Sequence, residues 1–254
     1  MKFGVCKDIK KLAGFNSDIV DYCEMPLSAI SKMTDEEINE RIMIIKSTGI
    51  PVICANGFFP KDMPLCGPDM NEEEVTKYTE NALKKAHMLG VKILVLGSGK
   101  ARYIEDGWDR ELCLEQFERV CFIAGEIASK YDMTVVIEPL GKGETNNINS
   151  VKEGADIVRH LDHPNVKLLC DIYHFETENE PIENITDNKD ILKHFHIANP
   201  DGRKYPKPTD AYDYTKFADT MKKIGYDGNL SIEGKDVDFD NELPISIKFL
   251  KSIF

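Results

Sequence analysis

The sequence lacks the features of membrane proteins and of nucleic-acid-binding proteins. No apolar stretch approaches the roughly 20 residues that a membrane span requires, and the N-terminal MKFGVCKDIKK contains no apolar run of a signal peptide. The chain has 32 lysine and arginine residues against 44 aspartate and glutamate residues, a net charge of −12. This acidic balance disfavours a phosphate-backbone partner, which needs a basic face. We therefore expect neither a membrane nor a nucleic acid as partner.

The chain also lacks the cysteine pattern of disulfide-bonded proteins. Its seven cysteines are an odd number, and no CxxC pair occurs. Such cysteines are typical of reduced thiols that pack as small core residues. We therefore expect a cytoplasmic protein.

No linker, internal repeat or low-complexity segment divides the sequence. A single domain is therefore predicted over residues 1–254. A GxGxxG motif after the first apolar run is absent as well, which disfavours a dinucleotide-binding sheet.

Short apolar runs predict eight strands. Several are apolar on successive residues, a pattern typical of parallel strands that are covered on both faces. The predicted strands are 2–6, 18–24, 51–56, 92–98, 134–140, 167–173, 194–199 and 229–234.

Longer amphipathic stretches between these runs predict helices. Thr34 with Glu37, and Ser150 with Glu153, form capping-box patterns at two of the helix starts. The predicted helices are 35–48, 72–89, 109–131, 151–161, 186–193, 213–224 and 241–253, and only the connection 8–17 has no clear pattern. The alternation and the chain length favour an α/β fold, a (β/α)8 TIM barrel, over a doubly wound open sheet.

Four ligand-type side chains lie near the carboxyl ends of four successive predicted strands. Glu138 and Asp171 are on two of them, and His196 and Glu233 are on the next two. An ionised carboxylate in an apolar strand is unfavourable unless it is paired or bound to a metal. Because these strand ends converge in a barrel, we expect the four groups to share one site.

Three carboxylates and one imidazole suit a divalent metal such as Mn²⁺, Mg²⁺ or Co²⁺ better than a structural zinc site, although Zn²⁺ stays open. Taken singly, each acid could instead cap a helix or form a surface ion pair. His194 lies on the same strand face as His196 and is the alternative imidazole ligand.

At this point the chain resembles a known family. The segments IEPLGKGET, CDIYH, FHIANPDGR and GYDGNLSIEG are similar to those of the sugar phosphate isomerase/epimerase branch of the xylose-isomerase-like barrels. That branch includes ketose 3-epimerases and hydroxypyruvate isomerase. The resemblance implies that Glu138, Asp171, His196 and Glu233 bind the metal, with Mn²⁺ the first choice, and that Glu138 and Glu233 also act as the acid and base.

The same resemblance implies a carbohydrate substrate and further contacts to it. Glu144, His174 and Arg203 match residues that face the substrate in the family. His174 could instead be a loop histidine, and Arg203 could be a charge at the rim. Barrels of the family often associate as dimers or tetramers, so homo-oligomers are expected.

The loop GSGKAR at 97–102 is a weaker candidate for substrate binding. Its backbone amides, with Lys100 and Arg102, could hold a phosphate or a carboxylate. Trp108, the only tryptophan, could form a wall of the site, or it could belong to the core or to a helix start.

The expected reaction is proton transfer next to a ketose carbonyl, with the metal as the Lewis acid that stabilises the enediolate. Isomerisation and epimerisation use the same machinery, and related barrels perform elimination, dehydration or C-glycoside cleavage. A nuclease of the AP-endonuclease type is a further alternative. Its additional zinc-binding histidines are absent at Ala55-Asn56 and Gly97-Ser98. A non-enzymatic scaffold is the last alternative.

Overall fold

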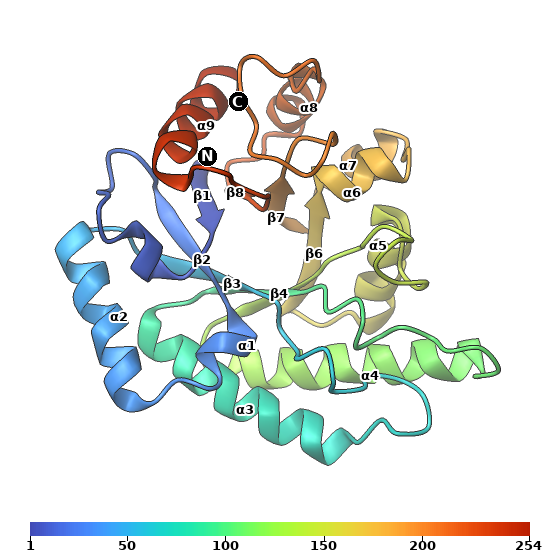
Figure 1. The fold of residues 1–254 in the computed structure, drawn as a ribbon. Helices are drawn as coiled ribbons and strands as arrows, with labels where there is room; N and C mark the ends of the chain where they lie inside the picture. The colour runs from blue at the N-terminus through green and yellow to red at the C-terminus, as the bar shows by residue number, and fades with distance from the viewer.

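Eight short parallel strands close into a barrel in the computed structural model, which describes residues 1–254 (Figure 1). Each strand pairs with its neighbour in the sequence, and β1 pairs with β8. The strands are β1 Lys2–Cys6, β2 Tyr22–Pro26, β3 Val52–Asn56, β4 Ile93–Leu96, β5 Thr134–Ile137, β6 Val166–Asp171, β7 Leu192–Ile197 and β8 Asn229–Ile232. The predicted (β/α)8 barrel is confirmed.

Helices surround the barrel, as Figure 1 shows. They are η1 Ile9–Leu12, α1 Leu27–Ile30, α2 Asp35–Thr48, α3 Glu72–Leu89, α4 Arg110–Ser129, α5 Val151–Leu161, α6 Ile172–Thr177, α7 Glu183–Thr186, α8 Thr215–Ile224 and α9 Phe239–Ile253. None of them combines the length and the apolar composition that a membrane crossing requires.

Two predicted boundaries near β6 and β7 were wrong. The strand predicted to run to 173 ends at Asp171, because the Asp171 side chain caps α6 there. The helix predicted at 186–193 is replaced by α7, a turn and the start of β7. Some apolar residues of that segment belong to β7. In a short window of sequence, the apolar periodicity of a helix cannot be distinguished from that of a strand.

The barrel interior has an apolar half and a polar half. Val95, Val136 and Leu169, from β4, β5 and β6, form a small apolar cluster separate from the main core. Beside β1, β2, β7 and β8 lie buried polar groups instead, among them Tyr22 and Ser231, which hydrogen-bond at 2.7 Å. Polar groups are unusual in the packed core of a barrel. Their position below the carboxyl-terminal mouth indicates a functional site there.

Gly4 on β1 makes room for this polar half. A Cβ atom at Gly4 would lie 2.3 Å from the Tyr22 ring. The absence of a side chain on β1 therefore lets a whole phenol ring lie inside the barrel.

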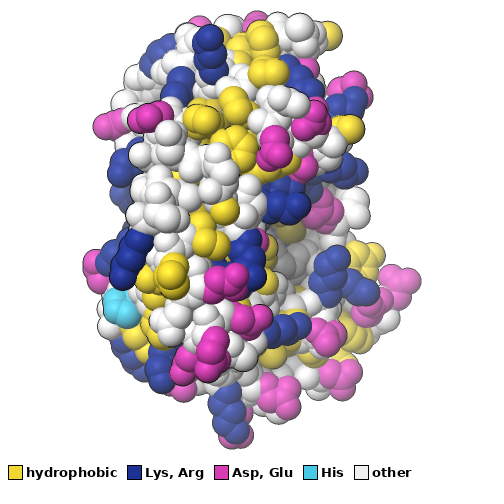
Figure 2. Space-filling view, turned by 60° about the vertical axis from the view of Figure 1, so that its left-hand side comes forward, with side chains coloured by type: hydrophobic (Ala, Val, Ile, Leu, Met, Phe, Trp, Pro, Cys, Tyr) yellow, Lys and Arg dark blue, Asp and Glu magenta, His cyan; other side chains and the backbone are white.

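Charged side chains of both signs are interspersed on the face shown in Figure 2. The two termini lie side by side, as Figure 1 shows, and the rings of Phe3 and Phe254 meet edge to face at 6.4 Å between centroids. The C-terminal helix thus packs next to the first strand.

Thr34 tests how much local capping contributes to this fold. Its hydroxyl accepts from Glu37 N and the Glu37 carboxylate accepts from Thr34 N, as the capping-box pattern predicted. We expect Thr34→Ala to lower stability by about 1 kcal/mol, a fall of roughly 2–4 °C in the melting temperature. Ser47→Ala, an exposed position on the same helix, is the control and should change stability by less than about 0.5 kcal/mol. Equal melting temperatures for the two variants would contradict the capping role of Thr34.

Candidate metal and substrate site

Four ligand-type side chains meet at the carboxyl-terminal mouth of the barrel. Glu138 follows β5 and Asp171 ends β6. His196 lies one residue before the end of β7, and Glu233 follows β8. One ligand atom from each lies within 4.8 Å of the others, so the group could hold a metal ion.

Strand register explains why these residues meet. Asp171 pairs with His196, and His196 pairs with Ser231, across three adjacent strands. Glu233 lies two residues beyond Ser231 and so projects from the same face of β8. Glu138 approaches from β5, on the far side of β6. The two glutamates therefore flank the other two groups.

The two carboxylate oxygens of Asp171 have different roles, one in capping a helix and one in the ligand cluster. Oδ1 accepts a hydrogen bond from Tyr173 N at 2.8 Å and caps α6. Oδ2 lies 3.4 Å from Arg203 Nη2 and 3.6 Å from His174 Nε2. The cap orients the side chain so that one oxygen remains for the cluster.

Arg203 reaches into this cluster from the loop after β7. Its backbone is left-handed, with φ 53°, next to Gly202 at φ 78°. Nη1 lies 2.7 Å from Glu144 Oε1, and Nη2 lies 2.5 Å from Glu233 Oε2. The guanidinium also stacks on the Tyr173 ring at 4.8 Å. Strained backbone of this kind is retained mainly where it positions a functional group.

Beneath the mouth, Glu24 of β2 organises the polar half of the barrel. Its Oε1 lies 2.9 Å from His196 Nε2, and its Oε2 lies 2.8 Å from His194 Nε2. Ser231 also donates to Oε2, and Tyr22 bonds to Ser231. All of these side chains are buried. A carboxylate that holds the remote nitrogen of a histidine directs the other nitrogen toward a metal.

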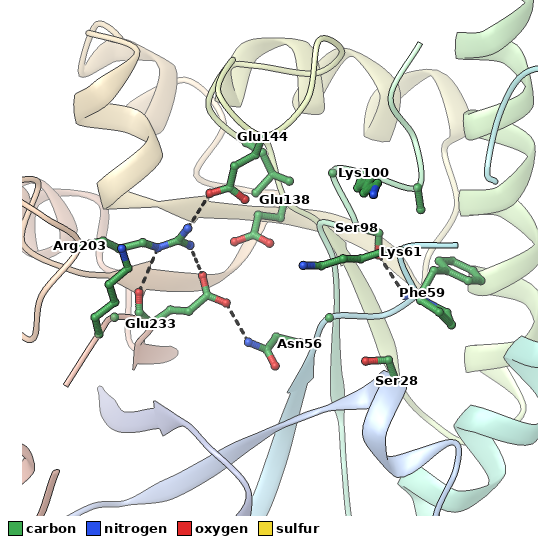
Figure 3. A pocket seen from close by; sticks show the side chains of 17 residues that line it. Ser28, Asn56, Phe59, Lys61, Ser98, Lys100, Glu138, Glu144, Arg203 and Glu233 are labelled. Atoms are coloured by element: carbon green, nitrogen blue, oxygen red, sulfur yellow. Dashed lines mark hydrogen bonds and ion pairs between the residues drawn. The ribbon is translucent and has the colours of Figure 1, made fainter. Parts of the chain in front are cut away.

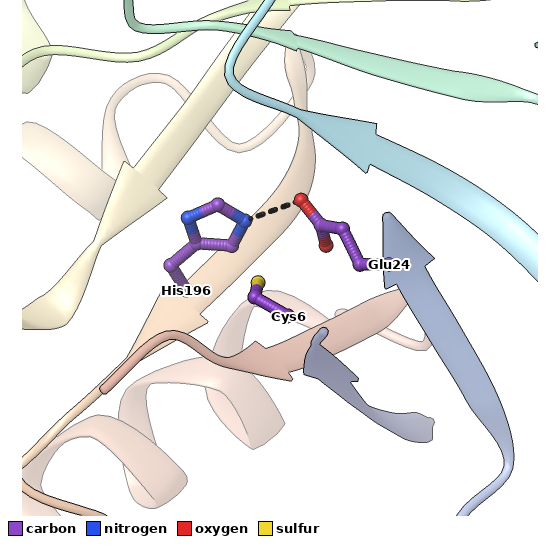
Figure 4. A group of neighbouring side chains, drawn as sticks. All are labelled: Cys6, Glu24 and His196. Atoms are coloured by element: carbon purple, nitrogen blue, oxygen red, sulfur yellow. Dashed lines mark hydrogen bonds and ion pairs between the residues drawn. The ribbon is translucent and has the colours of Figure 1, made fainter. Parts of the chain in front are cut away.

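Glu24 belongs to two further groups of potential ligands, one with Cys6 and His196 (Figure 4) and one with Cys54 and His194. Their carboxylate and imidazole atoms already bond to one another, and none is a buried atom without a partner. We therefore interpret them as one hydrogen-bond network that supports the mouth, not as a second metal centre.

Three groups at the mouth have shifted pKa values, and the directions differ. Burial, and then the charge of Glu233, raises the pKa of the Glu138 carboxyl. Burial also opposes ionisation of Glu233, but His196 and Arg203 outweigh it and lower the pKa of Glu233. Burial disfavours the charged form of His196, but Glu24 and Glu233 raise its pKa well above the usual value. Cations are therefore strongly favoured among these carboxylates.

A cavity of about 660 Å³ opens above the cluster. Figure 3 shows Glu138, Glu144, Arg203 and Glu233 on one side of it and Lys100 on the other. The cavity therefore brings together five of the residues that the sequence predicted for metal, acid–base or substrate roles. Its size suits a small organic ligand.

His174 lies beside this cavity with one unpartnered nitrogen. Its Nδ1 accepts from Gly141 N at 3.0 Å, so the proton of the neutral ring is on Nε2. Nε2 is buried and has no hydrogen-bond partner, and it lies between Asp171 Oδ2 at 3.6 Å and Glu144 Oε1 at 3.7 Å. A buried donor without a partner beside a cavity is a candidate contact for a ligand oxygen.

Arg102 does not contact the cavity, which corrects its predicted substrate role. The side chain is fully buried, stacks on the Phe117 ring at 5.1 Å and donates from Nη2 to the Glu138 carbonyl at 2.9 Å. Lys100 and its neighbours 98, 99 and 101 line the cavity, whereas the Arg102 side chain turns into the protein and holds the end of β5.

Trp108 also lies outside the cavity, which favours the alternative of a packing role over that of a wall of the site. Its ring packs with Cys66, Ile104 and Cys113 and lies against Gly67, where a Cβ atom would be 2.3 Å from the ring. The indole fills the gap between two loops, where its apolar area is covered.

Two residues of the site were not predicted from the sequence. Glu24 ends the run 18–24 that was predicted as a strand, which is the same signal that indicated Glu138, although in the structure it lies in the middle of β2. Asn56 ends β3, and its Nδ2 donates to Glu233 Oε1 at 2.8 Å. The position of Asn56 at a strand end was the only available signal.

Gly97, after β4, allows Glu138 to occupy its position. A Cβ atom at Gly97 would lie 2.2 Å from Glu138 Oε2. Since this carboxylate belongs to the cluster, a side chain at 97 would displace a candidate ligand.

The model of the xylose isomerase-like TIM barrel family matches residues 9–253. The chain belongs to this family. The resemblance seen in the sequence is thereby confirmed.

Similar proteins include two sugar epimerases. D-psicose 3-epimerase of Ruminiclostridium cellulolyticum is 26% identical over 237 residues, which cover 89% of this chain and 76% of that protein. 3-Dehydro-D-guloside 4-epimerase of Escherichia coli is 23% identical over 218 residues, with 80% and 79% covered. A crystal structure of D-psicose 3-epimerase in the presence of D-fructose superimposes with a TM-score of 0.86 at 18% identity, over 100% of this chain and 99% of that one.

Glu24 can be tested through metal affinity. We expect Glu24→Gln to weaken Mn²⁺ binding, measured by titration calorimetry, by about 10- to 100-fold, because the histidine loses the carboxylate that orients it. The control is Glu118→Gln, which alters another Glu–His pair, with His160, at the surface. Equal affinities in both variants would show that the network does not support the site.

Gly97 offers a second test. Gly97→Ala should weaken Mn²⁺ binding by on the order of ten-fold, because the added methyl group displaces the Glu138 carboxylate. This corresponds to a loss of about 1.4 kcal/mol in binding free energy. Gly143→Ala is the matched control, because nothing lies within 4 Å of a Cβ atom there. Wild-type affinity in Gly97→Ala would mean that Glu138 can move without loss.

Proposed function

We propose that the protein is a divalent-metal-dependent sugar isomerase or epimerase that transfers a proton next to a ketose carbonyl. The convergence of Glu138, Asp171, His196 and Glu233 below a cavity is the observation that carries the proposal. Membership of the family and the similarity to sugar epimerases support it.

The four converging side chains fit a divalent cation. Three carboxylates and an imidazole are the donor set of Mn²⁺, Mg²⁺ or Co²⁺, and we propose Mn²⁺ as the first choice. The bond from His196 Nε2 to Glu24 leaves Nδ1 on the side of the other three groups. When bound, the metal supplies Lewis-acid stabilisation of the negative charge that develops beside the carbonyl.

Glu138 and Glu233 are proposed as the groups that remove and return the proton. They come from β5 and β8, which flank the two strands between them. Epimerisation requires proton transfer on two faces of a planar intermediate, and carboxylates that approach from two sides meet this requirement. Asn56 and Arg203 hold the Glu233 oxygens at 2.8 and 2.5 Å and so fix its orientation.

His174, Glu144 and Arg203 are proposed to bind substrate oxygens. The unpartnered Nε2 of His174 is a donor for a hydroxyl or carbonyl oxygen. Arg203 bonds to Glu144 at 2.7 Å, so the two side chains can hold neighbouring hydroxyl groups as donor and acceptor. Lys100 contacts the substrate from the opposite wall.

Exchange of substrate hydrogen with D₂O tests the reaction. The Mn²⁺-loaded protein should incorporate deuterium next to the carbonyl of at least one ketose or ketose phosphate, detected by NMR. Glu233→Gln should lower this exchange by about 10²- to 10⁴-fold, the usual contribution of a positioned general base. Glu118→Gln should exchange like the wild type.

Two outcomes would contradict the proposal. Absence of exchange with every ketose and ketose phosphate in the metal-loaded protein would exclude proton transfer. Wild-type exchange in Glu233→Gln, with metal content unchanged, would remove Glu233 from the acid–base pair.

A further inference from the structure

The two sides of the cavity differ in charge. On one side are the carboxylates of Glu138, Glu144 and Glu233, as Figure 3 shows. On the other side are Lys61, from the loop after β3, and Lys100, from the loop after β4. The Lys61 side chain extends across the cavity toward the carboxylates. The first side also holds Arg203 and Lys235, so it combines carboxylates with cations, whereas the charged groups of the second side are lysines alone.

Neither lysine on the second side is neutralised by the protein. No ion pair or hydrogen bond joins the ammonium group of Lys61 or Lys100 to another residue of the cavity, whereas Lys142 at the same rim pairs with Glu178 at 3.2 Å. Both lysine side chains are exposed at the mouth of the cavity. Lys235, whose backbone N–H donates to the Arg203 carbonyl, also lines the cavity on the carboxylate side, and its ammonium group has no ion pair either.

Uncharged donors lie beside these lysines. The backbone N–H groups of Gly99 and Lys100 donate to no backbone carbonyl, and both residues line the cavity. Ser98 before them has a left-handed φ of 46°, and successive amides around such a residue form the concave arrangement that binds anions. The Ser28 hydroxyl points into the cavity from below Lys61 in Figure 3.

We propose that the substrate carries an anionic group, a phosphate or a carboxylate, and that Lys61, Lys100 and the 98–100 backbone bind it at the side of the cavity formed by the loops after β3 and β4. This inference rests on the proposed function. It adds the substrate class, because two cations and two unbonded backbone amides on one side of the cavity favour an anionic group. The two ends of the ligand would then orient the carbonyl toward Glu138 and Glu233.

Binding of matched sugars tests the proposal. The probes are D-fructose, D-fructose 6-phosphate and D-fructuronate, together with D-ribulose and D-ribulose 5-phosphate, titrated into the Mn²⁺-loaded protein by calorimetry. At least one anionic sugar should bind about ten-fold or more tightly than its neutral parent, because charge-assisted hydrogen bonds are the stronger kind. Preference for the phosphate or for the carboxylate identifies the group.

Lysine variants separate the proposed subsite from direct binding of the anion to the metal. In Lys61→Met and Lys100→Met the preference for the anionic sugar, measured as the ratio of its affinity to that of the neutral parent, should fall by about ten-fold. Lys142→Met, which removes a charge at the rim outside the cavity, should keep the preference, since its charge is largely screened at about 0.15 M salt.

The proposal is overturned if no anionic sugar binds more tightly than its parent, or if the preference survives in both lysine variants. Deuterium exchange distinguishes this failure from failure of the proposed function. Exchange with neutral ketoses alone would keep the isomerase or epimerase and exclude the anion subsite. Exchange with no sugar at all would remove both.

Discussion

The concentration of carboxylates at one barrel mouth is the constraint on which the rest of the site depends. Glu138, Asp171 and Glu233 are wholly or partly buried within a few ångströms of one another. Such a group is stable only with cations among its members. His196 and Arg203 supply positive charge from the chain itself, and a divalent metal would supply more. The same arrangement that is unfavourable for an empty protein is therefore favourable for metal binding.

The polar half of the barrel interior supports this mouth from below. Glu24 holds His194 and His196 together, and Ser231 and Tyr22 complete the network. Every polar atom of this network has a partner, so the buried groups impose little penalty and hold one geometry. Preorganisation of this kind limits movement of the histidine at the mouth. The apolar half, from β4 to β6, needs only packing.

The loops that follow the strands determine which charged groups line each side of the cavity. Arg203 enters from the β7 side and neutralises carboxylates on one side, whereas Lys61 and Lys100 keep their charges free on the other. Arg102 and Trp108, from the same connection as Lys100, face the interior and hold the loop in place. One connection thus contributes both a cavity residue and the packing that fixes it.

The amino-acid sequence by itself determined the barrel and the identity of the four converging residues. Strand periodicity and the position of acids at strand ends are local properties, and barrel closure then brings those ends together. Prediction from the sequence was wrong about the 186–193 segment and missed Glu24 and Asn56, because the roles of these two residues depend on partners more than 100 residues away. Only the tertiary structure decided which way Lys61, Lys100, Arg102 and Trp108 face, because loop side chains follow packing and not a period.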